Sequence, residues 1–252
     1  MGFLLKFANL KKENLKLNEQ LPRIEITERD IALFRYLNEQ KYMTAGQIYN
    51  KFWPDSTLRS GTGRQRLTKL VEAGYIKIHE LIRQKMKIFL LTTKGVQELR
   101  DRDLDYGLMS MDGANQAHVK HTLKLVEIRS VFEKMGPINW VSERVLRKLN
   151  RERKYFPDAI IEYKGLKTAV EFENSLKAKK IFLEKLDNYC KSSEFDLVIY
   201  IVSWMSALSW MIDVDVPQDK ITYTLYDDLM REKGESELRN LSGSIKVGAL
   251  FS

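Results

Sequence analysis

The chain has 252 residues, of which 44% are apolar and 30% charged, and its formal net charge is +8. This length suffices for one large domain or two of ordinary size, and the composition excludes a fibrous or disordered class. The sequence has no run of about 18 apolar residues and no secretory signal pattern, so we expect a cytoplasmic protein without a membrane partner. The single cysteine, Cys190, excludes an internal disulfide and a cysteine-based zinc site.

The basic excess is concentrated in the first part of the chain. Residues 1–110 contain 20 Lys and Arg against 13 Asp and Glu. A locally cationic segment favours a polyanionic partner, because each neutralised phosphate releases condensed counterions. A generally basic surface without such a partner is the alternative.

Residues 1–26 read as an N-terminal arm, and residues 27–105 predict three helices followed by a two-stranded hairpin. Thr27 and Thr44 are the expected N-caps of the first two helices. The third helix spans Thr62–Ala73 and stops at Gly74. The expected later elements are strands at Tyr75–Ile82 and Met86–Thr92 and a helix capped by Thr93.

This order of elements resembles a winged helix-turn-helix domain, whose third helix enters the DNA major groove. Guanidinium forks and amides suit purine edges, and hydroxyls and ammonium groups suit phosphates. The expected DNA contacts are Ser60, Thr62, Arg64, Gln65, Arg66 and Lys69 around the third helix, and Arg83, Lys85 and Lys87 in the wing. Winged helices also serve as protein-interaction modules, so an adaptor is an alternative.

Residues 106–113 are a loose, charged linker, and residues 114–230 predict a second α/β domain followed by a C-terminal tail at 231–252. The predicted elements are a helix at Ala114–Met135, a strand at Ile138–Val145, a hairpin at Ala159–Tyr163 and Thr168–Phe172, a helix at Leu176–Cys190, and strands at Phe195–Val202 and Ile221–Tyr226. We expect Ile181, Leu183, Leu186 and Tyr189 to form the buried stripe of the second long helix.

Three acids mark the hairpin of this second domain. Asp158 precedes its first strand, and Glu171 and Glu173 lie two residues apart in the second, so period-2 alternation places both glutamates on one face. Carboxylate oxygens are the ligands that Mg²⁺ and Mn²⁺ prefer, and such an ion activates water and stabilises charge on a phosphate. Solvated acids at a hairpin end are the alternative.

Pro157-Asp158 followed by Glu171-Phe172-Glu173 resembles the PD-(D/E)xK nuclease motif. The resemblance implies a restriction-endonuclease-like αβββαβ core, catalysis at Asp158, Glu171 and Glu173, and Mg²⁺ or Mn²⁺ bound by Asp158 and Glu171, with Glu173 completing the metal site or orienting water. The family has a lysine at the position of Glu173. The lysines early in the next helix, Lys177, Lys179 and Lys180, are candidates to return an ammonium to the site.

Other polar residues of the second domain are candidates for the same site. His118 and His121 share a helix face, where packing or hydrogen bonding is the alternative to a metal or phosphate role. Glu127 and Glu143 are each candidates to complete the metal site. A basic run at Arg144–Lys154 precedes Asp158 and is either a backbone contact for DNA or a solvated loop.

The two domains together resemble the replication-relaxation family of mobile elements, through NQAHVKHTL, WVSER and PDAIIEYKGLKTAVEFENSLKAKK. Its relatives include MobC-type relaxases, which nick plasmid transfer origins with a divalent metal. The resemblance implies a double-stranded DNA partner, other DNA-processing or transfer proteins, and strand nicking. A non-catalytic transcriptional or replication regulator with a degenerate nuclease-like domain is the alternative, and a homodimer is a candidate assembly.

Overall fold

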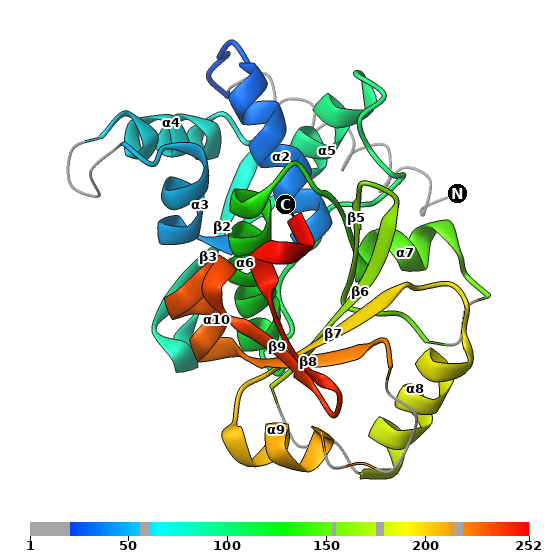
Figure 1. Cartoon of the computed structure of the whole chain (residues 1–252). Coiled ribbons are helices and arrows are strands. Elements are labelled where there is room, and N and C mark those ends of the chain that lie inside the picture. The colour runs from blue at the N-terminus through cyan, green and yellow to red at the C-terminus, as the bar shows by residue number, and fades with distance from the viewer. Residues whose placement is uncertain are drawn as a thin grey trace. The chain divides into compact units, whose positions relative to one another are not determined.

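The computed structural model describes residues 21–55, 61–152, 155–174, 179–212, 214 and 219–251. These residues form helices and two β-sheets, which confirms the predicted mixed α/β class. The chain divides into two compact units, unit 1 (Met1–Gln116) and unit 2 (Ala117–Ser252) (Figure 1). Among the described residues, no helix has both the length and the apolar character needed to cross a membrane.

Unit 1 contains four helices and three short strands in its described part. In chain order these are α2 (Glu28–Gln40), β1 (Met43–Thr44), α3 (Ala45–Phe52), α4 (Thr62–Glu72), β2 (Ile76–Leu81), β3 (Met86–Leu91) and α5 (Thr93–Arg100). The strands form an antiparallel sheet in the order β1-β3-β2, with Ile76 opposite Leu91 and Leu81 opposite Met86. A single turn of 3-10 helix, η1 (Ile82–Gln84), joins β2 to β3.

Local hydrogen bonds fix the starts of these helices. Thr27 and Thr44 each close a capping box, as the sequence predicted for both positions. The cap of α5 is Thr92 and not Thr93, because the Thr92 hydroxyl accepts from the Gly95 amide. Thr92 has the extended backbone conformation that an N-cap requires, so our assignment was wrong by one residue.

A buried ion pair joins α4 to α2 in unit 1. Arg66 Nε donates to Asp30 Oδ1 at 3.0 Å, and its Nη2 donates to Oδ2 at 2.5 Å. The side chain of Asp30 is fully buried, and it also closes the capping box with Thr27. Burial opposes ionisation of Asp30, but its hydrogen bonds from Arg66 and Thr27 hold its pKa below the ordinary value. The guanidinium of Arg66, which we predicted to contact DNA, is therefore engaged in an ion pair that joins two helices.

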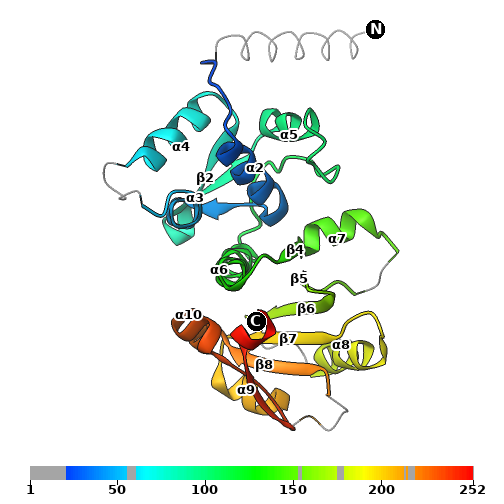
Figure 2. The ribbon, with the colours of Figure 1, turned by 45° about the horizontal axis from the view of Figure 1, so that its top comes forward.

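Unit 2 is built on a seven-stranded mixed sheet with the strand order β10-β9-β8-β7-β6-β5-β4. Its strands are β4 (Asn139–Ser142), β5 (Ala159–Tyr163), β6 (Leu166–Glu173), β7 (Leu197–Val202), β8 (Ile221–Leu225), β9 (Glu237–Asn240) and β10 (Gly243–Lys246). Strand β7 is parallel to both β6 and β8, and the other neighbours are antiparallel. Figure 2 shows β6, β7 and β8 side by side in that order.

Helices cover both faces of this sheet. Helices α6 (Val119–Met135) and α10 (Tyr226–Glu232) pack on one face, where Phe132 and Leu229 meet Val170 and Phe172 of β6. Helices α8 (Lys179–Lys191) and α9 (Met205–Ile212) pack on the other. Burial on both faces explains why β7 reads as a continuous apolar run.

The structure corrects three expectations for unit 2. The helix expected at Ala114–Met135 begins only at Val119. The strand expected at Ile138–Val145 ends at Ser142, where helix α7 (Glu143–Leu149) begins and takes up the first part of the basic run. The predicted tail instead forms the hairpin β9–β10. The side chains of Leu238 and Val247 are buried in the core, and the backbone of the hairpin forms hydrogen bonds with the sheet.

We expect Arg66→Ala to lower the free energy of unfolding by about 3 kcal/mol, because it leaves the buried Asp30 carboxylate without its charged partner. The matched control is Arg64→Ala, which removes an exposed guanidinium from the same helix and should change stability by less than about 0.5 kcal/mol. Urea denaturation followed by tryptophan fluorescence measures both. Equal effects of the two substitutions would contradict a structural role for Arg66.

Candidate functional site

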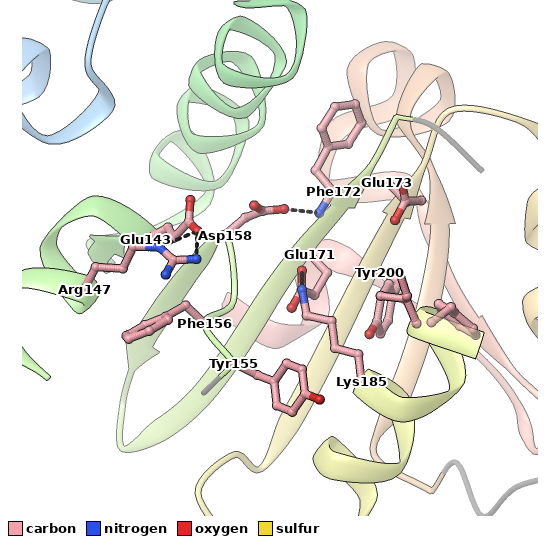
Figure 3. Close-up of a pocket in the computed structure, with 12 residues that line it drawn as sticks. Glu143, Arg147, Tyr155, Phe156, Asp158, Glu171, Phe172, Glu173, Lys185 and Tyr200 are labelled. Atoms are coloured by element: carbon pink, nitrogen blue, oxygen red, sulfur yellow. Dashed lines mark hydrogen bonds and ion pairs between the residues drawn. The ribbon is translucent and has the colours of Figure 1, made fainter. Parts of the chain in front are cut away.

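A pocket of about 260 Å³ lies in unit 2 among α7, the segment before β5, the end of β6, and α8 (Figure 3). It contains the three acids that the sequence singled out, Asp158, Glu171 and Glu173, together with Lys185 of α8. Glu143 and Arg147 of α7 line its other side. The predicted carboxylates therefore line one and the same pocket.

Asp158 is positioned by its neighbours on β6 and α6. The amide of Phe172 donates to Asp158 Oδ2 at 2.8 Å. His121 Nε2 lies 3.4 Å from the same oxygen and 3.0 Å from the Phe172 carbonyl oxygen. Burial opposes ionisation, but His121, Lys185 and the Phe172 amide hold the pKa of Asp158 below its ordinary value. Asp158 is therefore a carboxylate at neutral pH.

Glu171 is only 3% exposed and is held by two side chains of α8. Lys185 Nζ donates to its Oε2 at 2.5 Å, and the Tyr189 hydroxyl donates to its Oε1. Burial and the nearby Asp158 charge raise the pKa of Glu171 to about 7, although Lys185 and Tyr189 favour its ionised form. This carboxyl group therefore changes charge close to neutral pH.

Strand alternation accounts for the direction of both glutamates. Val170 and Phe172 enter the core under α6, whereas Ala169 enters the core under α8. Glu171 and Glu173 have the same parity as Ala169, so they lie on the α8 side of the sheet. Glu173 is 5% exposed and lines the pocket at the end of β6.

The sequence did not identify Lys185, whose ammonium group pairs with Glu171. On α8, Leu186 and Tyr189 are buried as predicted and Leu183 packs against the same core, but Ile181 is 53% exposed and Phe182 is buried in its place. Lys185 lies one turn before Tyr189 and three residues after Phe182, and this inward spacing was the available signal.

The lysines that we predicted for the site have other positions. Lys180 is exposed on α8. Lys179 begins the same helix, and its side chain lies outside the described part of the structure, as do all of Lys177 and Ser60. The observed ammonium beside Glu171 therefore comes from further along the helix than we expected.

The predicted metal site stays a prediction. Among the described residues, no group of three or more His, Cys, Asp or Glu side chains is arranged to hold a metal ion. Of the two candidate additional acids, Glu143 lines the pocket and pairs with Arg147 at 2.6 Å. Glu127 is not among the pocket-lining residues and accepts a hydrogen bond from Tyr226.

The two histidines of α6 have different surroundings. His118 is exposed just before the first residue of the helix, whereas His121 contacts Asp158 and its ring lies tilted against the Phe172 ring, with the two centroids 5.3 Å apart. In the basic run, Arg147 and Lys148 are exposed on α7, but burial lowers the pKa of Arg144 to about 10. Arg153 and Lys154 lie outside the described residues.

Unit 1 presents most of the predicted DNA contacts on its surface. Thr62, Arg64, Gln65 and Lys69 are exposed on α4. Arg83 and Lys85 are exposed at the turn η1, and Lys87 is exposed and pairs with Glu80 at 2.9 Å. Arg66 is the exception, because Asp30 holds it between the helices.

Comparison with known proteins places the chain in a family. A search of curated proteins and a search of solved structures gave no match. The model of the replication-relaxation family matches residues 34–195, which is more than half of the chain. The match includes α4, the turn η1 and the pocket acids. The chain therefore belongs to the replication-relaxation family.

Proposed function

We propose that this chain is a DNA-processing protein of a plasmid or another mobile element. In this proposal unit 1 recognises duplex DNA, and unit 2 nicks a strand with the help of a divalent metal ion. Membership of the replication-relaxation family supports a role in replication or relaxation. The observation that carries the strand-cutting step is the Lys185–Glu171 pair, which lies in the same pocket as Asp158.

The element order of unit 1 supports a winged helix-turn-helix domain. Helices α2, α3 and α4 precede the hairpin β2–β3, and β1 pairs with β3 at the edge of the small sheet. In such domains the third helix reads the major groove and the hairpin contacts the backbone. The exposed Arg64 and Gln65 on α4 then face base edges, and Arg83 and Lys85 face phosphates.

The element order of unit 2 supports a PD-(D/E)xK-like core. The succession α6, β4, β5, β6, α8, β7 follows the order of that core, with α7 inserted after β4. The family's strand lysine is replaced by Glu173, and Lys185 supplies an ammonium beside Glu171 from α8. In this proposal the Lys185 ammonium takes the role of the strand lysine, which is absent from this sequence.

The donor groups of the pocket fit Mg²⁺ or Mn²⁺ through two carboxylates. Asp158 and Glu171 are both acceptors, and Mg²⁺ is commonly held by one or two carboxylates while it keeps several waters. A bound divalent ion would supply an activated water and positive charge beside the phosphate. Glu173 then has no obligatory place among the metal ligands.

The residues around this pair have separate tasks in the proposed reaction. The Phe172 amide and His121 orient the Asp158 carboxylate. The Tyr189 hydroxyl orients Glu171 by donating a hydrogen bond to its Oε1. Lys185 has two further N–H groups besides the one it gives to Glu171, and these stabilise negative charge on the phosphate.

A non-catalytic DNA-binding regulator is the second candidate, and one observation favours it. Both carboxylate oxygens of Glu171 already accept hydrogen bonds, from Lys185 and Tyr189. A metal ion would have to share these oxygens or displace a donor. In this alternative the pocket is a structural remnant, and only unit 1 acts on DNA.

We expect Lys185→Met to lower the metal-dependent nicking rate by about a hundredfold, because it removes a donor to the developing negative charge. The substrate is a supercoiled plasmid carrying the gene's own neighbourhood, with Mg²⁺, Mn²⁺ or a chelator. Lys180→Met is the matched control, because it removes an exposed ammonium from the same helix. Absence of nicking by the wild type, together with tight sequence-dependent binding, would favour the regulator.

We expect Arg64→Ala to weaken binding to the recognised duplex about tenfold or more, because a lost guanidinium contact to a guanine edge costs about 1–3 kcal/mol. Arg102→Ala makes the same charge change beyond α5 and should weaken binding far less. Fluorescence anisotropy at fixed salt measures both. If the two variants bind equally, α4 is not the reading helix.

We expect the affinity for Mn²⁺ to rise with pH and to level off above about pH 7, where Glu171 of the free protein is ionised. The reason is that burial raises the pKa of Glu171 to about 7, so the carboxylate is protonated at lower pH, and a bound cation shifts this ionisation downward. The electron paramagnetic resonance signal of free Mn²⁺ measures binding. Glu171→Gln should show weak binding without this rise, and an unchanged profile in that variant would contradict the assignment.

A further inference from the structure

One buried hydroxyl group of unit 2 has no hydrogen-bond partner among the described residues. Tyr200 is 2% exposed, and its hydroxyl oxygen is buried and unbonded. A buried polar group without a partner loses its bonds to water and gains nothing in return. Such groups are rare in native structures, and their presence calls for a reason such as a ligand.

The position of Tyr200 indicates where a partner would come from. Tyr200 on β7 is the register partner of Glu171 on β6, and it lines the same pocket as Lys185 (Figure 3). Phe182, Tyr189 and Tyr223 pack around its ring, with centroids 5.4, 6.3 and 5.7 Å away. Because these rings surround Tyr200 within the core, a ligand reaches it from the pocket.

The chemistry of the pocket selects the kind of ligand. Burial, with the nearby charge of Glu171, raises the pKa of Tyr200 well above its ordinary value, so the group remains a neutral O–H donor. Lys185 is a second donor with N–H groups to spare. A phosphate oxygen is an acceptor that matches both donors, whereas the ionised Asp158 carboxylate has no proton to donate to it.

We propose that the Tyr200 hydroxyl donates a hydrogen bond to a phosphate oxygen of the DNA strand bound in this pocket, next to the Lys185 ammonium. This inference rests on the proposed function, because the strand phosphate is its ligand. It makes Tyr200 a substrate-contacting residue of strand cutting, contributed by β7 and outside the Asp158–Glu171–Glu173 motif.

The test is Tyr200→Phe in the full chain, which keeps the ring and removes only the hydroxyl. We expect resistance to urea to be unchanged or higher, because the variant lacks the unbonded group. Inorganic phosphate with Mn²⁺ should raise the melting temperature of the wild type but not of Tyr200→Phe. Nicking should slow about tenfold, the worth of one hydrogen bond, with duplex affinity unchanged.

Tyr223→Phe is the matched control, because Tyr223 stacks on Tyr200 but does not line the pocket. It should keep both the phosphate shift and the nicking rate. A clear loss of urea resistance in Tyr200→Phe would reveal an internal partner for the hydroxyl and overturn the proposal. The proposal is also overturned if phosphate does not raise the melting temperature of the wild type, or if it raises that of Tyr200→Phe as well.

The outcomes for the inference and for the proposed function are separable. A phosphate shift that depends on Tyr200 in a wild type that never nicks its own DNA supports the phosphate contact and overturns strand cutting. Equal nicking by the wild type and Tyr200→Phe overturns the Tyr200 contact while strand cutting stands.

Discussion

The pairing of Glu171 with Lys185 is the interaction on which the pocket of unit 2 depends. A carboxylate that is only 3% exposed is costly to ionise unless a positive charge and hydrogen bonds compensate it. Lys185 and Tyr189 provide both, and in doing so they fix α8 against the end of β6. The compensation leaves the pKa of Glu171 at about 7, so the contact that holds the helix also leaves a carboxyl group that changes charge near neutral pH.

Unit 1 uses the same kind of contact for a different purpose. Arg66 of α4 and Asp30 of α2 form a bidentate ion pair that holds the two helices together. Arg64 and Gln65, the neighbours of Arg66 on α4, remain exposed. The rigid position of α4 and the freedom of these two side chains together make a surface that can read DNA. In the proposed function the ion pair holds α4 in place, and the exposed Arg64 and Gln65 on that helix contact the DNA.

Three polar residues that line the pocket of unit 2 share one face of the sheet. Glu171 and Glu173 on β6 and Tyr200 on β7 lie on the side covered by α8. Parallel strands in register bring Glu171 and Tyr200 side by side, which no pattern within either strand reveals. The rings of Phe182, Tyr189 and Tyr223 surround Tyr200 and keep water away from its hydroxyl group. In such surroundings hydrogen bonds are stronger and an unpaired donor is costly.

The sequence by itself determined the local features: the caps at Thr27 and Thr44, the two-residue alternation of Glu171 and Glu173, and the buried run of β7. These follow from hydrogen bonds and periodicities within a few residues. Only the tertiary structure decided that Lys185, 14 residues from Glu171, pairs with it in the pocket, and that Arg66, 36 residues from Asp30, pairs with that buried carboxylate. It also decided that residues after 231 extend the sheet. Such pairings depend on how helices and strands pack against each other, and single-element patterns carry no information about that.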